Sequence, residues 1–225
     1  MSNLSIKATN DGSSTIYNKE LDEHYHSIHG ALQESLHVFI EMGLNYHVKH
    51  NENLQKLNIL EIGFGTGLNC ILTLIEHLKN EKIAVKYSAI EPFPLNSTSL
   101  KSLNFKLSNQ HLNLFNKIHE SNWEKENIIL NNFNISKYNL KLKDFKTNSF
   151  YDLIYFDAFA PRKQPELWTV DVFKKVYNLT NKNGVLVTYC AKGQVRRDLE
   201  SVGFKVERLQ GPPGKREMLR AQKII

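Results

Sequence analysis

Residues 60–70, LEIGFGTGLNC, place glycine at every second position, at Gly63, Gly65 and Gly67, directly after a short apolar run. Glycine has no Cβ atom, so its backbone approaches a ligand closely and adopts positive φ at little cost. An apolar run that leads into such a turn is typical of a buried strand ending in a ligand-binding loop. The stretch therefore predicts that a ligand lies against bare backbone at this turn.

Strand and helix patterns alternate on both sides of this stretch, since short apolar runs alternate with segments of helical periodicity. The expected strands are residues 57–62, 84–90, an ambiguous 128–135, 150–156, 185–189, 204–209 and 217–221. The expected helices are residues 30–42, 68–78, the second part of 92–107, 166–179 and 193–202. Residues 131–146 are rich in asparagine and give no clear pattern, and residues 4–18 predict a small hairpin around Asp11-Gly12.

Alternating strands and helices indicate an α/β fold with a mainly parallel sheet covered on both faces. The last two strands are joined only by GPPGKR, so they must pair antiparallel. A parallel sheet that ends in an antiparallel hairpin is typical of class I S-adenosylmethionine-dependent methyltransferases, which are Rossmann-like. We expect residues 51–225 to form that domain and residues 1–50 to form a small N-terminal extension that caps it.

The spacing of the glycine turn favours a particular cofactor. Glu61-x-Gly63-x-Gly65-x-Gly67 is tighter than G-x-G-x-x-G and carries an acid at the end of the strand. It resembles an S-adenosylmethionine loop more than the fingerprint of a nicotinamide dinucleotide. Glu91 ends the next strand, where a carboxylate accepts hydrogen bonds from two ribose hydroxyls. Phe93 and Pro94 follow it and are candidates for an adenosine wall.

The stretch IYFDAFAPRKQPELW suggests a catalytic group. Asp157 ends an apolar strand, so it should lie at the same sheet edge as the glycine turn. Asp-Ala-Phe-Ala-Pro loosely resembles the polar–proline–aromatic turn of amine methyltransferases. An ammonium has no lone pair and must lose a proton before it attacks a methyl group, and a neighbouring carboxylate takes that proton. Trp168 is interpreted as a packing residue.

Composition limits the number of domains, the location of the protein and the kind of partner that it binds. The chain has 225 residues and 41% hydrophobic residues, enough for one domain with a real core. No apolar run approaches the ~20 residues that span a membrane, and the N-terminus shows no signal pattern, so we expect a cytoplasmic protein. Cys70 and Cys190 both read as core residues. Most of the net charge of +6 falls within residues 192–225, and a basic face favours a polyanionic partner.

Five motifs in this order carry a family resemblance: EIGFGTGLN, IEPFPL, FDAFAPRKQPELW, GQVRRDLESVGF and GPPGKREMLRA. Together they resemble the tRNA-modifying methyltransferases that complete 5-methylaminomethyl-2-thiouridine at the wobble position, the MnmC-like and MnmD-like family. The resemblance covers roughly residues 17–221. It implies methyl transfer from S-adenosyl-L-methionine to the primary amine of a 5-aminomethyl group on wobble uridine of tRNA.

The resemblance also assigns roles to matching positions. It implies that the methionine part of the cofactor is held by Glu61, Gly63, Phe64, Gly65 and Gly67, with help from Asn69. Glu91 would hold the ribose with Phe93 beside it, and Asp157 would be the catalytic acid/base. The acceptor pocket or the tRNA would be contacted by Tyr25, Phe159, Pro161, Lys215 and Arg216.

Two departures from the family pattern stand out. Some relatives carry a flavin oxidoreductase domain that makes the free amine, and the absence of a second dinucleotide loop here implies that a separate enzyme supplies the aminomethyl group. Residues 128–140 hold no clear acid for the adenine amino group, only asparagines such as Asn132. The nearby His24, His26 and His29 lack the spacing and partners of a metal site, so we expect no metal.

Other functions stay open from the sequence alone. The chain resembles class I methyltransferases in general, so a small amine or a protein is an alternative substrate. A nucleotide-binding or RNA-binding module without catalysis is an alternative of a different class. Redox chemistry with a nicotinamide cofactor is disfavoured by the loop spacing and by the terminal hairpin.

Overall fold

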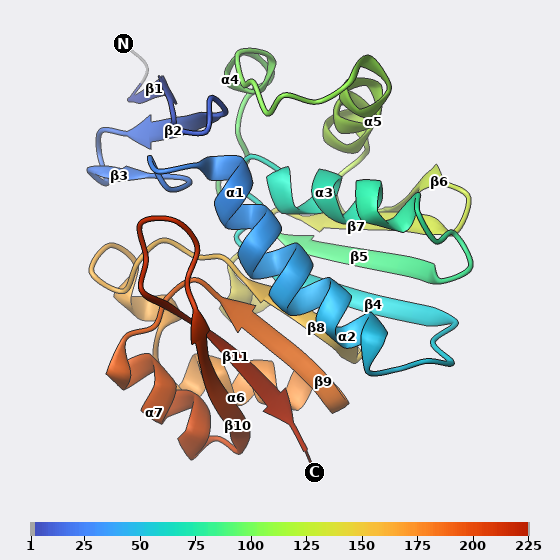
Figure 1. Cartoon of the computed structure of the whole chain (residues 1–225), viewed down its shortest axis with the longest axis vertical. Helices are drawn as coiled ribbons and strands as arrows, with labels where there is room; N and C mark the ends of the chain where they lie inside the picture. The colour runs from blue at the N-terminus through green and yellow to red at the C-terminus, as the bar shows by residue number, and fades with distance from the viewer. Residues whose placement is uncertain (1–2, 225) are drawn as a thin grey trace.

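A computed structural model describes residues 3–224 and shows an eight-stranded sheet in the order β10-β11-β9-β8-β4-β5-β7-β6 (Figure 1). The parallel strands are β4 (Lys56–Ile62), β5 (Ala84–Ile90), β7 (Phe133–Tyr138), β8 (Tyr151–Phe156) and β9 (Thr180–Thr188). The antiparallel strands are β6 (Glu126–Leu130), β10 (Phe204–Gln210) and β11 (Glu217–Lys223). The predicted α/β fold with a terminal antiparallel hairpin is therefore confirmed.

Helices cover both faces of this sheet, because successive strand residues point to opposite sides. Ile59 faces a core shared with α3 (Leu68–His77) and α5 (Asn109–Glu120). Its neighbour Leu60 faces a second core with α6 (Val170–Leu179) and α7 (Gly193–Ser201). The shorter helical segments are α4 (Ser97–Lys101), η2 (Leu142–Asp144) and η3 (Pro165–Leu167).

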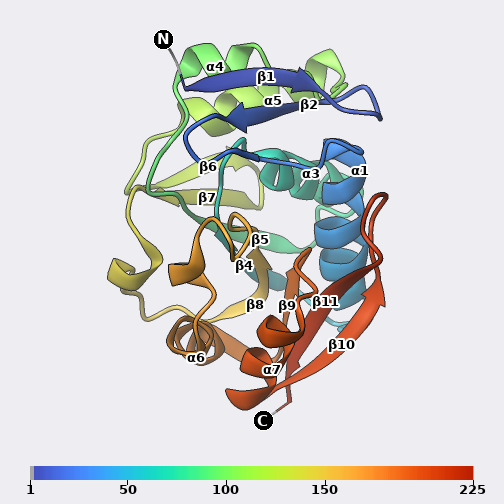
Figure 2. The same ribbon diagram turned by 90° about the vertical axis from the view of Figure 1, so that its left-hand side faces the viewer.

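The N-terminal part forms a small sheet and a long helix. The sheet consists of β1 (Leu4–Ala8), β2 (Ser14–Asn18) and β3 (Glu23–His24), which confirms the predicted hairpin and adds a third strand. Figure 2 shows β1 and β2 beside α4 and α5, at the opposite end of the molecule from β10. The helix runs continuously through α1 (Ala31–Ser35), η1 (Leu36–Asn45, π-helical) and α2 (Tyr46–Lys49).

This long helix packs directly on the sheet. Val38 and Phe39 are fully buried in the same core as Tyr155 of β8, and the two rings of Phe39 and Tyr155 lie 5.2 Å apart. The helix is thus part of the main core, whereas the three-stranded sheet lies outside it. The division of the chain at residue 50 stays a prediction.

Four segments differ from the sequence expectations. The helix predicted over residues 30–42 continues to Lys49, and within residues 92–107 only Ser97–Lys101 is helical. Helix α5 was not predicted, because its sequence NQHLNLFNKIHE buries only Phe115 and Ile118. The ambiguous region around residues 128–135 is a β6–β7 hairpin, and Asn132 adopts φ 60° at its turn.

Strand β4 lies between β5 and β8, because the chain runs from β4 to β5 and β7 on one side of it and then returns to β8 on the other. Ligands of open α/β sheets bind at this switch point. Cys70 and Cys190 are both buried and unbridged, as predicted. Within residues 3–224 the structure contains no helix with the length and apolar character needed to cross a membrane.

Candidate active site

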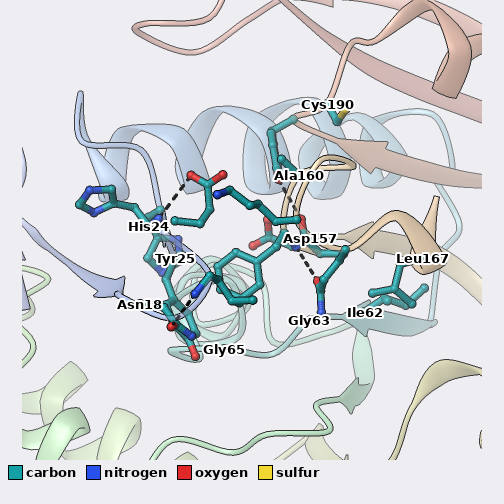
Figure 3. A pocket seen from close by; sticks show the side chains of 18 of the residues that line it. Asn18, His24, Tyr25, Ile62, Gly63, Gly65, Asp157, Ala160, Leu167 and Cys190 are labelled. Carbon is teal, nitrogen blue, oxygen red and sulfur yellow. Dashed lines mark hydrogen bonds between the residues drawn. The ribbon is translucent and has the colours of Figure 1, made fainter. Parts of the chain in front are cut away.

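A cavity of about 1510 Å³ opens at the carboxyl ends of the central strands. Its lining comes from the glycine turn after β4, the segment after β5, the loop after β8 and the N-terminal sheet. Figure 3 shows Asp157, Gly63, Gly65 and Tyr25 around the same space. The volume exceeds the range usual for one small-molecule ligand, so the cavity has room for a cofactor and part of a second substrate.

Most of the predicted site residues line this cavity. Those that do are Tyr25, Gly63, Phe64, Gly65, Glu91, Phe93, Asp157, Phe159, Pro161, Lys215 and Arg216. Glu61, Gly67 and Asn69 are not on the wall but lie beneath it. The structure therefore brings together residues that are up to 191 positions apart, and it places three predicted cofactor residues in a supporting layer.

The glycine turn needs its glycines for two reasons. Gly63, Gly65 and Gly67 have φ values of 92°, 50° and 73°, which side chains rarely allow. A Cβ atom on Gly63 would also overlap the backbone oxygen of Asp157. The Gly63 amide donates to the oxygen of Ile90 at 3.0 Å, which ties the turn to the end of β5. The result is a turn without side chains, here called the cradle, where a ligand can lie directly against the backbone.

Glu91 is held at the end of β5 by two backbone amides. Gly65 donates to one carboxylate oxygen and Phe93 donates to the other, both at 2.9 Å. Burial raises the pKa of Glu91, while these two hydrogen bonds lower it. Each oxygen keeps a lone pair, so the group can still accept hydrogen bonds from two ribose hydroxyls. The Phe93 side chain is 67% exposed at the rim.

Asp157 is linked to the supporting layer by one amide group. The Asn69 side-chain nitrogen donates to Asp157 at 2.8 Å and to Glu61 at 2.9 Å. Tyr87 donates to the other oxygen of Glu61 at 2.8 Å. Burial and the neighbouring Asp157 raise the pKa of Glu61 well above its usual value. Burial above all, with Glu34 nearby, raises the pKa of Asp157 to about 7.

This arrangement favours proton transfer at neutral pH. A carboxyl with a pKa near the working pH both accepts and releases protons readily. Asn69 fixes the orientation of Asp157 without blocking its second oxygen. The structure thus makes Asp157 a candidate general base, and Glu61 and Asn69 candidates for its support.

The loop of residues 157–168, here called the acceptor loop, begins at Asp157 and is fixed by contacts with Trp168 and with the N-terminal segment. The buried Trp168 donates its indole N–H to the oxygen of Phe159 at 2.8 Å, so its interpretation as a packing residue is confirmed. The rings of Phe159 and Tyr25 meet edge to face at 5.0 Å. Arg162 and Glu23 form an ion pair at 2.8 Å between this loop and β3. The loop and the N-terminal sheet therefore form one continuous wall.

Two histidines that are far apart in sequence form hydrogen bonds with the glycine turn at Thr66. His26 Nε2 lies 2.6 Å from the hydroxyl of buried Thr66, and His119 Nε2 lies 3.1 Å from its backbone oxygen. The ring of His119 also packs against Phe64 at 5.5 Å. The ammonium of Lys137, fully buried on β7, bonds the backbone oxygen of His119 at 2.9 Å and so fixes the end of α5. The turn is thus supported from three sides.

We expect this histidine contact to make the protein sensitive to mild acid. Burial lowers the pKa of both His26 and His119 from 6.5 to about 4. Between these values the unfolded chain binds the protons and the folded protein does not, so the free energy of unfolding falls as the pH falls. The expected loss is about 1.4 kcal/mol per pH unit for each histidine. Urea unfolding at pH 7, 6 and 5 measures it.

The control is the double variant His26→Asn/His119→Asn. Asparagine keeps a polar group but does not titrate in this range, so the double variant should lose stability less steeply with pH than the wild type. Equal slopes in the two proteins would contradict the assignment of the acid sensitivity to this contact.

Sequence reasoning missed several residues that line the cavity. Tyr189 follows β9 at the same sheet edge, and the strand-end rule that found Asp157 also applies to it. Glu34 is buried on α1 and belongs to the N-terminal segment of the family resemblance, but no role of its own was predicted for it. Lys141 and Lys143 line the wall just after β7, where the sequence offered no acid for adenine.

The chain is similar to known proteins in both sequence and fold. Residues 98–224 match a family model described as S-adenosyl-L-methionine-dependent methyltransferase. The chain belongs to this methyltransferase family. The crystal structure of MnmC2 from Aquifex aeolicus superposes on this methyltransferase with a TM-score of 0.81 at 28% identity, covering 98% of this chain and 70% of that one.

Curated relatives match the same chain. The tRNA 5-methylaminomethyl-2-thiouridine biosynthesis bifunctional protein MnmC of Leptospira interrogans is 32% identical over 222 residues, which is 91% of this chain. The MnmC protein of Actinobacillus pleuropneumoniae is 28% identical over 232 residues, which is 95% of this chain. These matches confirm the family resemblance given by the motifs. The chain spans about a third of the length of these relatives.

A more distant likeness concerns the fold alone. Spermidine synthase from Thermotoga maritima superposes with a TM-score of 0.57 at 15% identity over 98% of this chain. The methyltransferase therefore shares its sheet and helices with a wider group of enzymes, and its own function depends on the residues of the cavity.

Proposed function

We propose that this methyltransferase transfers a methyl group from S-adenosyl-L-methionine to the primary amine of a 5-aminomethyl group on (2-thio)uridine at the tRNA wobble position. The product is 5-methylaminomethyl-(2-thio)uridine. The observation that carries the proposal is a buried carboxyl group, Asp157, whose pKa is raised to about 7 beside a backbone cradle in a cavity with room for two reactants.

The residues present fit the cofactor. The bare backbone of Gly63 and Gly65 would accommodate its amino-acid part, and Glu91, at the end of the next strand, would accept hydrogen bonds from the ribose hydroxyls. S-adenosyl-L-methionine, when bound, supplies an electrophilic methyl group on a sulfonium. Glu61, Gly67 and Asn69 hold the cradle from beneath, and Phe93 borders its rim. The role of each residue in cofactor binding stays a proposal.

Asp157 performs the proton chemistry in this proposal. The substrate amine arrives largely as an ammonium, and Asp157 removes one proton to expose the nitrogen lone pair. A new N–CH3 bond then forms as the S–CH3 bond breaks, which leaves S-adenosylhomocysteine and a secondary ammonium. Phe159 and Pro161 of the acceptor loop and Tyr25 of the N-terminal segment confine the amine, so that the reactants are aligned.

The polyanionic partner is inferred from charge. The cavity lining holds acidic and basic residues, and the cations Arg162, Lys163 and Lys215 are paired with Glu23, Asp22 and Glu34. Four further basic residues border the cavity: Lys141, Lys143, Lys192 and Arg216. Such a rim attracts phosphates, and the anticodon stem-loop of a tRNA offers a flipped wobble base with phosphates around it. The name of the curated relatives, which refers to tRNA 5-methylaminomethyl-2-thiouridine biosynthesis, supports the same partner. A separate enzyme that supplies the aminomethyl group, and a cytoplasmic location, belong to this proposal.

The proposal is tested with tRNA that carries 5-aminomethyl-2-thiouridine. The protein and S-adenosyl-L-methionine are incubated with this tRNA, and the nucleosides are then analysed by mass spectrometry. We expect the aminomethyl nucleoside to gain one methyl group. tRNA that lacks the aminomethyl group is the control and should stay unchanged. If methyl transfer occurs to small alkylamines or to a protein but not to this tRNA, the substrate assignment is wrong.

A further inference from the structure

An ammonium group already lies in a small site on the cavity wall. Lys215 places its Nζ atom 2.7 Å from a carboxylate oxygen of Glu34 and 3.8 Å from the centroid of the Tyr189 ring. A carboxylate and an aromatic face together form a favourable environment for a cation. All three residues line the same cavity as Asp157.

The carboxylate comes from a helix and the ring from the residue after β9, whereas the ammonium comes from a loop. Glu34 lies in the first turn of α1 and its side chain is only 7% exposed. The Tyr189 hydroxyl donates to the backbone oxygen of Ala158 at 2.8 Å, next to Asp157. Lys215 comes from the loop between β10 and β11, after Gly214 at φ 84°, and its side chain is 30% exposed. The ammonium in the site thus belongs to a partly exposed loop residue.

The charges around the site leave room for another ammonium. Glu34 and Asp157 are two acidic groups that share one internal cation, and both Glu34 and Lys215 act electrostatically on Asp157. An ammonium that enters the cavity would meet a carboxylate, a ring face and the proposed general base within one small region. A neutral molecule of the same shape would gain none of these interactions.

We propose that Glu34 and Tyr189 form an ammonium-binding subsite beside Asp157, that Lys215 occupies this subsite in the free protein, and that the substrate's primary ammonium takes its place. Glu34 thereby becomes a substrate-binding residue that recognises the charged amine. Lys215 then moves toward the basic rim, where Arg216 also lies. This inference rests on the proposed function, since it assumes an amine acceptor.

The test uses the variant Lys215→Met and the probe ethylammonium, with binding followed by calorimetry. Methionine keeps most of the length of the side chain but removes its charge, which leaves Glu34 without its cation. We expect Lys215→Met to bind ethylammonium at least about tenfold more tightly than the wild type, because a buried carboxylate without a cation is costly. Ethanol is the neutral probe of similar size and should not bind.

Further substitutions, added to Lys215→Met, show whether the gain in ethylammonium binding depends on Glu34 and Tyr189. Adding Glu34→Gln to Lys215→Met should abolish the gain in ethylammonium binding. Adding Tyr189→Leu should weaken it, whereas Tyr189→Phe, which keeps the ring, should preserve it. Thermal unfolding and binding of S-adenosylhomocysteine show whether each variant is folded, and Lys215→Gln replaces Lys215→Met if the latter does not fold.

If the folded variant shows no gain, the Lys215–Glu34 pair only fastens the loop to α1 and the inference is overturned. The binding measurement needs no tRNA, so its failure and the failure of tRNA methylation are separate results.

Discussion

Replacing Asp157 with Asn is expected to lower the rate of methyl transfer by about 10²–10⁴-fold, the usual contribution of a positioned general base. Asparagine has nearly the same shape and can still accept the hydrogen bond that Asn69 donates at 2.8 Å. Only the ability to take a proton is lost. The measurement is single-turnover methylation of aminomethyl tRNA together with the affinity for S-adenosylhomocysteine, which should change little.

The pH profile gives a second readout of the same group. Burial raises the pKa of Asp157 to about 7, so the carboxylate form is progressively lost below that pH. The wild-type rate should fall about tenfold per pH unit on the acid side, and the variant should lose this dependence. Asp171→Asn, an exposed position in the first turn of α6, is the control with the same change in charge. A variant at Asp157 that keeps the wild-type rate would exclude the carboxylate as the base.

The second large effect is expected from Gly63→Ala. The new Cβ atom would overlap the backbone oxygen of Asp157, and alanine would be forced to φ 92°. Strain and overpacking of this kind cost about 2–6 kcal/mol together. The overlap also pushes the glycine turn away from the acceptor loop, so we expect cofactor affinity to fall more than about tenfold. Urea unfolding and calorimetry with S-adenosylhomocysteine measure the two effects.

Gly193→Ala is the matched control for this prediction. Gly193 is the first residue of α7, and the nearest atom to a new Cβ is the flexible end of Arg197 at 3.3 Å. Alanine suits a helix at least as well as glycine, so stability and cofactor affinity should stay close to those of the wild type. Equal behaviour of the two variants would mean that the bare backbone at Gly63 is not required.

The sequence alone determined the parts of this protein that depend on local patterns. Apolar runs such as those of β4 and β8 place Gly63, Glu91 and Asp157 at strand ends, and the carboxyl ends of parallel strands meet at one edge. This rule predicts a shared site at that edge from the sequence alone. The short GPPGKR connection likewise required an antiparallel hairpin, because no crossover fits in so few residues. The family motifs added the chemistry of the site.

Local patterns failed where burial depended on distant partners. Lys137 interrupts the apolar alternation of FNISKY, so the ambiguous strand predicted over residues 128–135 covered only the first part of β7, yet the Lys137 ammonium is buried against the end of α5. Helix α5 itself has few apolar residues and is recognised only once it packs on the sheet. In both cases a polar residue is satisfied by a segment that the sequence does not place beside it.

Only the tertiary structure decided how the cavity is charged and supported. Asn69 reaches Asp157 across 88 positions, His26 reaches Thr66, and Glu34 meets Lys215 across 181 positions. Desolvation and Coulomb interactions depend on distances in space, so the raised pKa of Asp157 has no signature in its neighbours along the chain. The sequence determined which chemical groups lie at the sheet edge. The packing of α1, α5 and the β10–β11 loop decided the hydrogen-bond partners and the pKa values of these groups.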